Sequence, residues 1–329
     1  MASRSAGIEV RSKYKKAEWP LAGDGFDNLK SISHTAWAVR NGAETCDVIH
    51  LNDAAGLALQ QFTRLPFVYT IHHPSLPEFS RFYIEHAEVW FVAISDFQRA
   101  TEPMRRLRTI HHGLDLSKYK FQPQKSDYLS FIGRLAPCKG ADVALQVAKR
   151  SGMPLKIAGQ IQPRDREYFA REIKPHLDGN FIEYVGEVDL AAKNDLLGNS
   201  SAMLFPIRWN EPFGLVMIEA MACGTPVLAS SGGSVAEVVR PGISGYVCSS
   251  VQQLVTSVQQ LPALAPANIR KYVERHFSSA SMARAYLQTY RESIGEHLHA
   301  KTDGVCPRPA ESVALESECS VTSSADSAL

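Results

Sequence analysis

Two glutamates, Glu211 and Glu219, occur in the stretch NEPFGLVMIEAMACGTP. Its central part, LVMIEAMAC, is almost wholly apolar; Glu211 stands before this apolar part and Glu219 lies inside it. Pro212 suits a helix start and Gly224 a helix stop, so the segment predicts a helix that is apolar on all sides and therefore buried. A carboxylate in such a helix needs a partner, because an unpaired buried charge is costly.

The partner of Glu219 is either a cation of the protein or a hydroxyl group of a ligand. Vicinal diols present two hydroxyl donors that one carboxylate can accept. Glu211 adjoins the exposed N–H groups expected at Phe213, Gly214 and Leu215, a combination that suits a polyol carrying a phosphate. The alternative is structural: Glu211 complements the helix dipole and Glu219 pairs with a neighbouring arginine.

A second candidate site is the turn in FIGRLAPCKG, where a predicted strand ends at Gly133 and a helix begins near Gly140. Arg134 and Lys139 flank a loop that opens onto the helix N-terminus, which favours an anion such as a diphosphate. The loop matches neither the P-loop nor the glycine-rich dinucleotide motif. The alternative is two basic residues on a surface loop.

The segment SSGGSVAEV has a structural interpretation. Ser234 and Glu237 have the S-x-x-E spacing of a capping box, which is sufficient to explain both. Gly232 and Gly233 allow the backbone to approach another surface closely.

Two histidine pairs, His72-His73 and His111-His112, fall in predicted strands. Adjacent residues of a strand point to opposite faces, so neither pair is expected to bind one metal ion. His72, at a strand end facing a cleft, suits a hydrogen-bonding role, and a satisfied interior histidine is the alternative.

Short apolar runs alternate with helix-like stretches, which predicts an α/β fold with parallel sheets. Ligands of such sheets bind at the carboxyl ends of the strands. Predicted helices include 54–63, 78–86 and 96–107, and a linker is expected at 115–127. We expect four parts, at residues 1–117, 118–275, 276–298 and 299–329, of which the serine-rich last part is a disordered tail.

The length and composition of the chain limit the classes of protein to which it can belong. The 329 residues suggest two domains, and a formal net charge of +1 disfavours nucleic-acid binding. Six cysteines without a CxxC pair favour a reducing cytoplasm. The polar, basic start is not a secretory signal, and no run of apolar residues is long enough for a transmembrane helix. Arg11, Lys13, Lys15 and Lys16 allow peripheral contact with an anionic membrane, although a frayed, solvated terminus is the favoured explanation.

Taken together, these motifs resemble the retaining glycosyltransferases of family 4, which have the GT-B fold. The E-x7-E spacing of Glu211 and Glu219 is the most specific feature. FIGRLAPCKG, LKIAG, FIEYVGEV, SSGGSVAEVV and GISGYV occur in the family's order, and the resemblance covers about residues 128–292. It implies two Rossmann-like domains facing a cleft, with the C-terminal helix 276–298 packing back toward the N-terminal domain.

The resemblance also implies a role for each residue that matches a family position. Arg134 and Lys139, beside Gly133, hold the donor diphosphate, and Glu219 binds the ribose hydroxyls. Glu211 and the N–H groups of residues 213–215 face the transferred sugar or the phosphate. The backbone at Gly186 and Val188 borders the nucleobase. His72 faces the sugar from the acceptor domain, and Ser95 lies at the interdomain cleft. Cys138, where an acidic or polar residue is common, is expected to leave the anion site untouched.

Members of this family are typically metal-independent and need no cofactor beyond the nucleotide-diphosphate sugar. The resemblance thus implies a hexosyltransferase-type enzyme of carbohydrate biosynthesis, acting on a sugar, lipid or small-molecule acceptor. The acceptor half is short by roughly two βα units, which suggests a truncated or diverged N-terminal domain. The alternatives are therefore an inactive nucleotide-sugar-binding remnant and, less compatible with the lysines present, a phosphorylase that uses pyridoxal phosphate.

Overall fold

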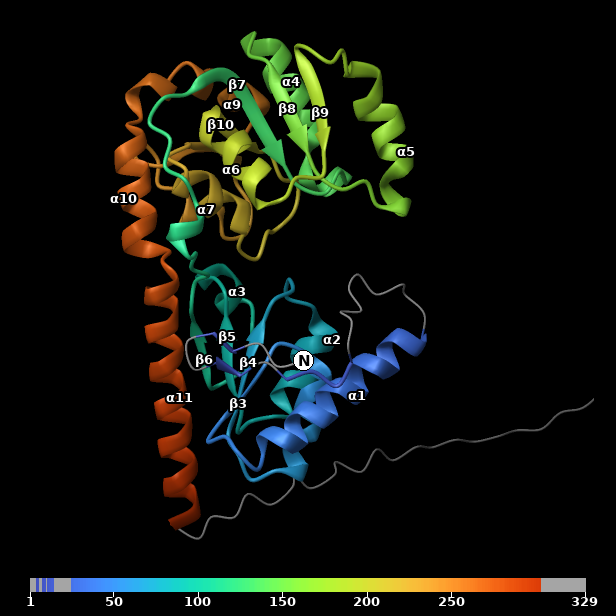
Figure 1. Cartoon of the computed structure of the whole chain (residues 1–329), viewed down its shortest axis with the longest axis vertical. Coiled ribbons are helices and arrows are strands. Elements are labelled where there is room, and N and C mark those ends of the chain that lie inside the picture. The colour runs from blue at the N-terminus through green and yellow to red at the C-terminus, as the bar shows by residue number, and fades with distance from the viewer. Residues whose placement is uncertain (1–3, 6–7, 10, 15–24, 303–329) are drawn as a thin grey trace, which may run out of the picture.

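The computed structural model describes residues 4–5, 8–9, 11–14 and 25–302 of the chain. It contains two parallel sheets with helices around them, one in the upper and one in the lower half of Figure 1. A further pair of short antiparallel strands comprises β1 (Arg4–Ser5) and β2 (Ile8–Glu9). The predicted α/β class with two parallel sheets is confirmed.

The first sheet has four parallel strands in the order β3-β4-β5-β6. All residues of β4 are buried, as expected for a parallel strand covered on both faces. We call this sheet with its helices the first domain. Its strands are β3 (Ile49–Leu51), β4 (Phe67–Ile71), β5 (Trp90–Ala93) and β6 (Leu107–Thr109). Its helices are α1 (Gly25–Gly42), the 3₁₀ helix η1 (Ala54–Phe62), α2 (Pro77–Ile84) and α3 (Asp96–Ala100).

The second sheet has six parallel strands in the order β12-β11-β10-β7-β8-β9 and forms the second domain with its helices. Two buried apolar clusters, which include Leu129, Ile157 and Met217, cover its two faces. Its strands are β7 (Ser126–Ile132), β8 (Leu155–Ala158), β9 (Ile182–Gly186), β10 (Ser200–Phe205), β11 (Val227–Ser230) and β12 (Gly245–Cys248). Its helices are α4 (Ala141–Ser151), α5 (Arg166–Tyr168), α6 (Leu190–Asn199), α7 (Leu215–Ala222), α8 (Val235–Val238), α9 (Val251–Val258) and α10 (Pro266–His276).

Short helical turns occupy several loops. They are η2 (Leu116–Lys118), η3 (Pro137–Lys139), η4 (Pro163–Asp165), η5 (Phe169–Ile173), η6 (Lys174–His176) and η7 (Leu261–Ala263).

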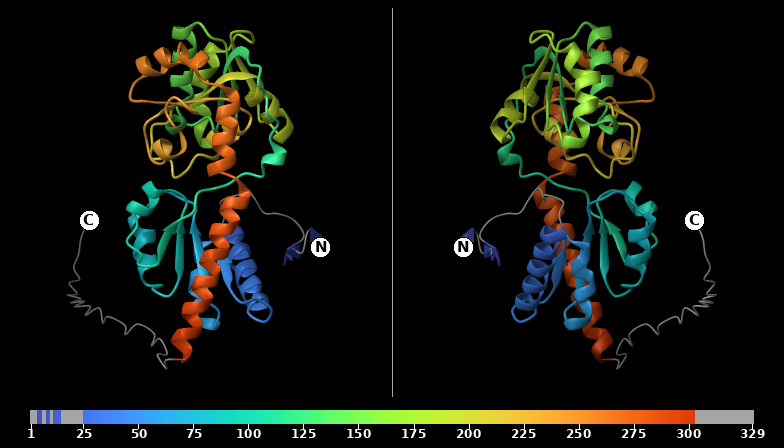
Figure 2. Two further views of the ribbon diagram at one scale, coloured as in Figure 1. Left: turned by 90° about the vertical axis from the view of Figure 1, so that its left-hand side faces the viewer. Right: turned by 90° about the vertical axis from the view of Figure 1, so that its right-hand side faces the viewer.

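The chain passes between the domains twice, and the two passages lie against each other. The N–H of Leu114 donates to the carbonyl of Phe277 at 2.8 Å, and the N–H of Ser279 donates to the carbonyl of Leu114 at 2.8 Å. A Cβ atom at Gly113 would lie 2.3 Å from the carbonyl oxygen of Ser278, so this approach requires glycine. The long helix α11 (Ser279–Thr302) then runs down the side of the first domain, while α10 stays on the second (Figures 1 and 2).

Several expectations about elements need correction. The predicted helix 96–107 ends at Ala100, because Pro103 follows closely and the chain then enters β6. The sequence analysis did not anticipate α1. Residues 299–302 continue α11 rather than belonging to a tail, and residues 303–329 lie outside the described part of the chain.

Of the basic residues considered for membrane contact, Lys15 and Lys16 lie outside the described residues, and Lys13 donates to the hydroxyl of Ser33. None of the helices in the described part of the chain has both the length and the apolar character of a membrane span.

Candidate active site

Lys139 and Glu211 form an ion pair at the centre of the candidate site. Nζ of Lys139 lies 2.5 Å from Oε2 of Glu211, and the indole N–H of Trp209 donates to the same oxygen at 2.9 Å. The ammonium group also lies 4.6 Å from the centre of the Trp209 ring. Glu211 is buried and Lys139 is mostly buried, so the pair is shielded from solvent.

Close backbone contact between two loops brings this pair together. The loop after β7 ends at Gly140, whose φ of 75° falls in the left-handed region. A Cβ atom there would lie 2.0 Å from the carbonyl oxygen of Pro206, at the start of the loop that carries Glu211. The N–H of Arg208 donates to the carbonyl of Cys138 at 2.8 Å, which aligns the two loops. Lys139 therefore faces Glu211 because glycine permits the approach.

Arg134, the other predicted cation, points toward a different carboxylate. Its Nε lies 3.6 Å from Oδ2 of Asp165, and both atoms are buried without a hydrogen-bond partner in the described part of the chain. Its Nη2 lies 3.8 Å from Sγ of Cys138. The thiol thus contacts the guanidinium group, while the expectation that Cys138 leaves the roles of Arg134 and Lys139 unchanged stays a prediction.

Glu219 is held by groups from outside its own helix. Nζ of Lys193, on α6, lies 2.9 and 3.1 Å from its two carboxylate oxygens. The hydroxyl of Tyr119 donates to Oε1 at 2.8 Å, and burial together with the charge of Glu219 raises the pKa of Tyr119. Of the two alternatives for Glu219, a protein cation is present, and it is a lysine instead of an arginine.

The glycine-rich loop lies against the backbone of Glu211, as the two glycines predict. Gly233 has a φ of 56°, and a Cβ atom there would lie 2.1 Å from the carbonyl oxygen of Glu211. The N–H of Ser234 donates to that oxygen at 3.0 Å, while its hydroxyl donates to the carbonyl of Phe213 at 2.9 Å. Ser234 thus fixes the loop around Glu211 and does not cap α8, so the predicted capping box is wrong.

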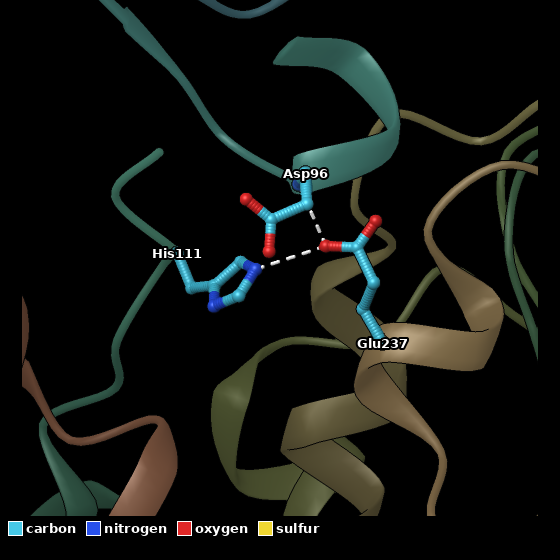
Figure 3. A group of neighbouring side chains, drawn as sticks. All are labelled: Asp96, His111 and Glu237. Carbon is cyan, nitrogen blue, oxygen red and sulfur yellow. Dashed lines mark hydrogen bonds and ion pairs between the residues drawn. The ribbon is translucent and has the colours of Figure 1, made fainter. Parts of the chain in front are cut away.

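Glu237, the other half of that expected box, reaches across to the first domain (Figure 3). Its carboxylate accepts hydrogen bonds from the N–H groups of Asp96 and Phe97 at 2.7 and 2.6 Å, and it contacts Nε2 of His111 at 3.0 Å. It therefore caps the first turn of α3 from the opposite domain. Asp96, His111 and Glu237 cluster closely enough to hold a metal ion, but each is already bonded within the protein.

His72 is connected to the second domain through His112. The two imidazole rings stack with centroids 5.6 Å apart, and the His112 ring meets the Phe213 ring edge-on at 5.1 Å. Nε2 of His72 bonds Oδ1 of Asn52 at 2.8 Å. Burial, and then the charge of His73, lowers the pKa of His72. Burial, followed by His72 and His111, lowers the pKa of His112 to about 4.

A cavity of about 440 Å³ lies between the domains, next to the loop that carries Glu211. We call it the interdomain cavity. Its first-domain wall comes from the segment after β4 and from α3, and its second-domain wall comprises Trp209, Asn210 and Pro212. Among its lining residues, Trp209 contacts both Lys139 and Glu211, which do not line the cavity themselves.

The remaining predicted residues lie around the strand ends of the second domain. Gly214 has a φ of 80° and precedes α7, and no hydrogen bond of the described chain uses the N–H groups of Phe213, Gly214 or Leu215. Gly186 ends β9 with a φ of 81°, and Val188 follows it half-buried before α6. Neither Gly186 nor Val188 contacts the Lys139–Glu211 pair in the described hydrogen bonds and ion pairs.

Residues 115–272 match the family model described as Glycosyl transferases group 1. Glycogen synthase of Mycobacterium tuberculosis is 28% identical over 285 residues, which cover 74% of this chain and 68% of that protein. D-inositol 3-phosphate glycosyltransferase of Mycobacterium bovis is 28% identical over 219 residues, which cover 58% of this chain and 45% of that protein. The chain thus spans less than half of the length of this second relative.

The crystal structure of Anabaena Alr3699/HepE in complex with UDP has a TM-score of 0.69 and 20% identity, and covers 80% of this chain and 84% of that one. At this identity the likeness concerns the fold, which is that of the GT-B glycosyltransferases. The segment that is similar to the group 1 glycosyl transferases, residues 115–272, contains Arg134, Lys139, Glu211 and Glu219.

Sequence reasoning missed several neighbours of the predicted site. Lys193, Tyr119 and Trp209 each contact one of the two predicted glutamates, and His112 joins His72 to Phe213. Trp209 stands two residues before Glu211, so its position alone was a usable signal. Lys193 and Tyr119 carry no local signal, because only the packing of α6 and η2 against α7 brings them to Glu219.

Proposed function

We propose that this protein transfers a hexosyl group from a nucleotide-diphosphate sugar to an acceptor hydroxyl with retention of anomeric configuration. The observation that carries the proposal is the shielded Lys139–Glu211 pair together with the N–H groups of Phe213, Gly214 and Leu215, unbonded within the described chain, at the N-terminus of α7. The relatives named above are a glycogen synthase and a D-inositol 3-phosphate glycosyltransferase, and Alr3699/HepE was crystallised with UDP and with UDP-glucose. These likenesses support a nucleotide sugar as the donor.

The roles follow from what each group can donate or accept. Lys139 has three N–H donors, so it can keep Glu211 and still bind a diphosphate, with Arg134 and Gly133 alongside. Glu219 would accept the ribose hydroxyls, and the backbone at Gly186 and Val188 would border the base. Glu211 and the N–H groups of Phe213–Leu215 would hold the transferred sugar, with His72 approaching from the first domain.

In the proposed reaction the bond between the anomeric carbon and the diphosphate oxygen breaks. The acceptor oxygen bonds to that carbon from the same face, and its proton passes to the departing phosphate oxygen. The negative charge that develops on the diphosphate is stabilised by Lys139 and Arg134, so catalysis consists mainly of positioning and electrostatics. We propose that these groups act without a metal ion or another cofactor.

The decisive test is Lys139→Ala, assayed as UDP release from UDP-glucose in the presence of acceptors. Loss of one charge-stabilising donor should cost about 2–4 kcal/mol, so kcat/KM should fall about 30- to 1,000-fold. The matched control is Lys149→Ala, whose ammonium group contacts exposed His176. Unchanged kcat/KM in Lys139→Ala would reject the diphosphate role, and donor binding without transfer to any acceptor would favour the inactive sugar-nucleotide binder.

A separate experiment tests whether the proposed reaction needs a metal ion. Enzyme treated with EDTA and exchanged into metal-free buffer should retain its rate, because cationic side chains neutralise the leaving group in this proposal. Loss of the rate that Mg²⁺ or Mn²⁺ restores would contradict it.

A further inference from the structure

The walls of the interdomain cavity carry no charge. Of the described residues that line it, all are neutral, and they combine two aromatic rings, Phe97 and Trp209, with three prolines. Its volume of about 440 Å³ falls in the range of roughly 300–1,000 Å³ that is usual for small-molecule sites. The cavity thus offers flat apolar surface and no counter-ion for a charged ligand.

The polar groups of the cavity suit hydroxyl groups. Thr101 donates its hydroxyl to the carbonyl of Gln98 at 2.8 Å, and Ser75 donates to the carbonyl of Thr101 at 3.3 Å, so both oxygens can still accept. Oδ1 of Asn210 accepts from the N–H of Gly233 at 3.3 Å, which leaves its amide N–H groups as donors. Acceptors and donors therefore border the apolar surface.

Gln98 makes one wall rigid. Its side chain is almost fully buried, and Nε2 donates to the carbonyls of Ile71 and His73 at 3.2 and 2.7 Å. Its Oε1 accepts from the N–H of Ile94 at 2.8 Å. These bonds tie α3 to the ends of β4 and β5, so the first-domain wall of the cavity is held in place by the protein itself.

The geometry points to the interdomain cavity as the subsite for an uncharged carbohydrate acceptor, an inference that rests on the proposed transferase function. A sugar ring has an apolar face that packs on aromatic and proline surfaces, and hydroxyl groups on its edge that match Ser75, Thr101 and Asn210. A phosphorylated acceptor would bring a dianion into this neutral cavity, which is unfavourable without a cation. Lys139 lies against the Trp209 ring, but the proposed function assigns its remaining donors to the donor diphosphate.

The test separates acceptor binding from donor binding. The probes are the methyl glycosides of glucose, galactose, mannose and N-acetylglucosamine, each compared with its 6-phosphate. Saturation-transfer NMR in the presence of UDP measures their binding, and calorimetry measures the affinity for UDP itself. Phe97→Ala removes the aromatic wall from the first domain, and Phe97→Leu keeps apolar volume. The control is Phe62→Ala, whose ring is 77% exposed on η1.

We expect at least one neutral glycoside to bind at least tenfold more tightly than its phosphate. Phe97→Ala should weaken that binding at least tenfold and raise the KM for the acceptor by a similar factor. Phe97→Leu should have a smaller effect on both quantities. Neither variant should change the affinity for UDP. Tighter binding of the phosphates, binding insensitive to Phe97→Ala, or no glycoside binding while UDP binds would each overturn the subsite. Failure of UDP to bind would instead reject the donor site and the proposed function.

Discussion

At the scale of single residues, the environment of Glu219 shows how a carboxylate is accommodated in an apolar helix. Its side chain is nearly buried, and Lys193 and Tyr119 supply the donors that the helix cannot. Two oxygens have about four lone-pair positions, and the three bonds from Lys193 and Tyr119 leave about one of them for a ligand hydroxyl. Lys193 thereby acts as a positioning residue for the carboxylate.

Lys193→Met tests that role. It leaves a mostly buried carboxylate with the Tyr119 hydroxyl as its remaining described partner, which should lower the free energy of unfolding by about 1–3 kcal/mol. If Glu219 binds the ribose, the dissociation constant for UDP-glucose should also rise. Urea denaturation and calorimetry measure the two effects. Lys156→Met, which removes an exposed pair with Glu183, is the control. A stability loss with unchanged donor affinity would limit Lys193 to a structural role.

At the scale of elements, the short helix α3 depends on both domains. Ser95 caps it from within by accepting from the N–H of Gln98 at 3.1 Å. Glu237 accepts from two further N–H groups in the first turn. The capping residue and the negative charge that favour a helix start thus come from different domains, so α3 is most stable when the domains face each other as in this structure.

Glu237→Gln tests this dependence. A glutamine offers one acceptor oxygen and turns its amide toward the second N–H group, so the interdomain bond should lose about 1–2 kcal/mol. The expected result is a lower urea midpoint together with a larger radius of gyration in X-ray scattering. Glu78→Gln, which breaks an exposed pair with Arg81, should change neither quantity strongly. A compact variant with the stability of the unmodified protein would argue against a capping role.

At the scale of the whole molecule, α11 fastens the end of the described chain to the first domain. Tyr286 and Tyr290 of α11 pack beside Val68 and Val92 of the first sheet. His50 bonds the Tyr290 hydroxyl at 2.7 Å and the Thr70 hydroxyl at 2.8 Å. Burial, with a smaller contribution from His72, lowers the pKa of His50 to about 4. The contact between α11 and the first sheet therefore favours a neutral imidazole.

Acidic pH should lower the free energy of unfolding, because it protonates histidines that are neutral in the folded protein. His50 and His112 have folded-state pKa values of about 4 against an ordinary value of 6.5, so the unfolded chain binds more protons between these limits. The stability that the neutral histidines contribute is complete above about pH 6.5 and is lost as the pH falls toward 4. Each residue should cost on the order of 2 kcal/mol at pH 5. Urea denaturation at pH 7 and at pH 5 measures the combined loss of stability from both histidines. His50→Gln should reduce the difference between the free energies of unfolding at the two pH values. Equal stability at both pH values would refute the prediction.

Much of the fold and part of the site followed from local patterns. The apolar segment with Pro212 and Gly224 predicted a buried helix, and α7 occupies residues 215–222 with Gly224 at a φ of 79°. The turn with Lys139 was recognisable because a glycine-ended strand and a helix start lie within ten residues of each other. Such signals are local, since helix periodicity, caps and turn glycines depend on residues close together in the chain.

Which distant groups meet was decided only by the tertiary structure. Tyr119 and Lys193 stand 100 and 26 residues from Glu219, and Glu237 stands 141 residues from Asp96. A local pattern carries no information about such pairs, because they depend on the strand order of the second sheet and on the double crossing between the domains. The sequence by itself determined the secondary elements and the chemistry they present. The tertiary structure brought Glu237 against the first domain and formed the interdomain cavity, because both require surfaces from two different sheets and their helices.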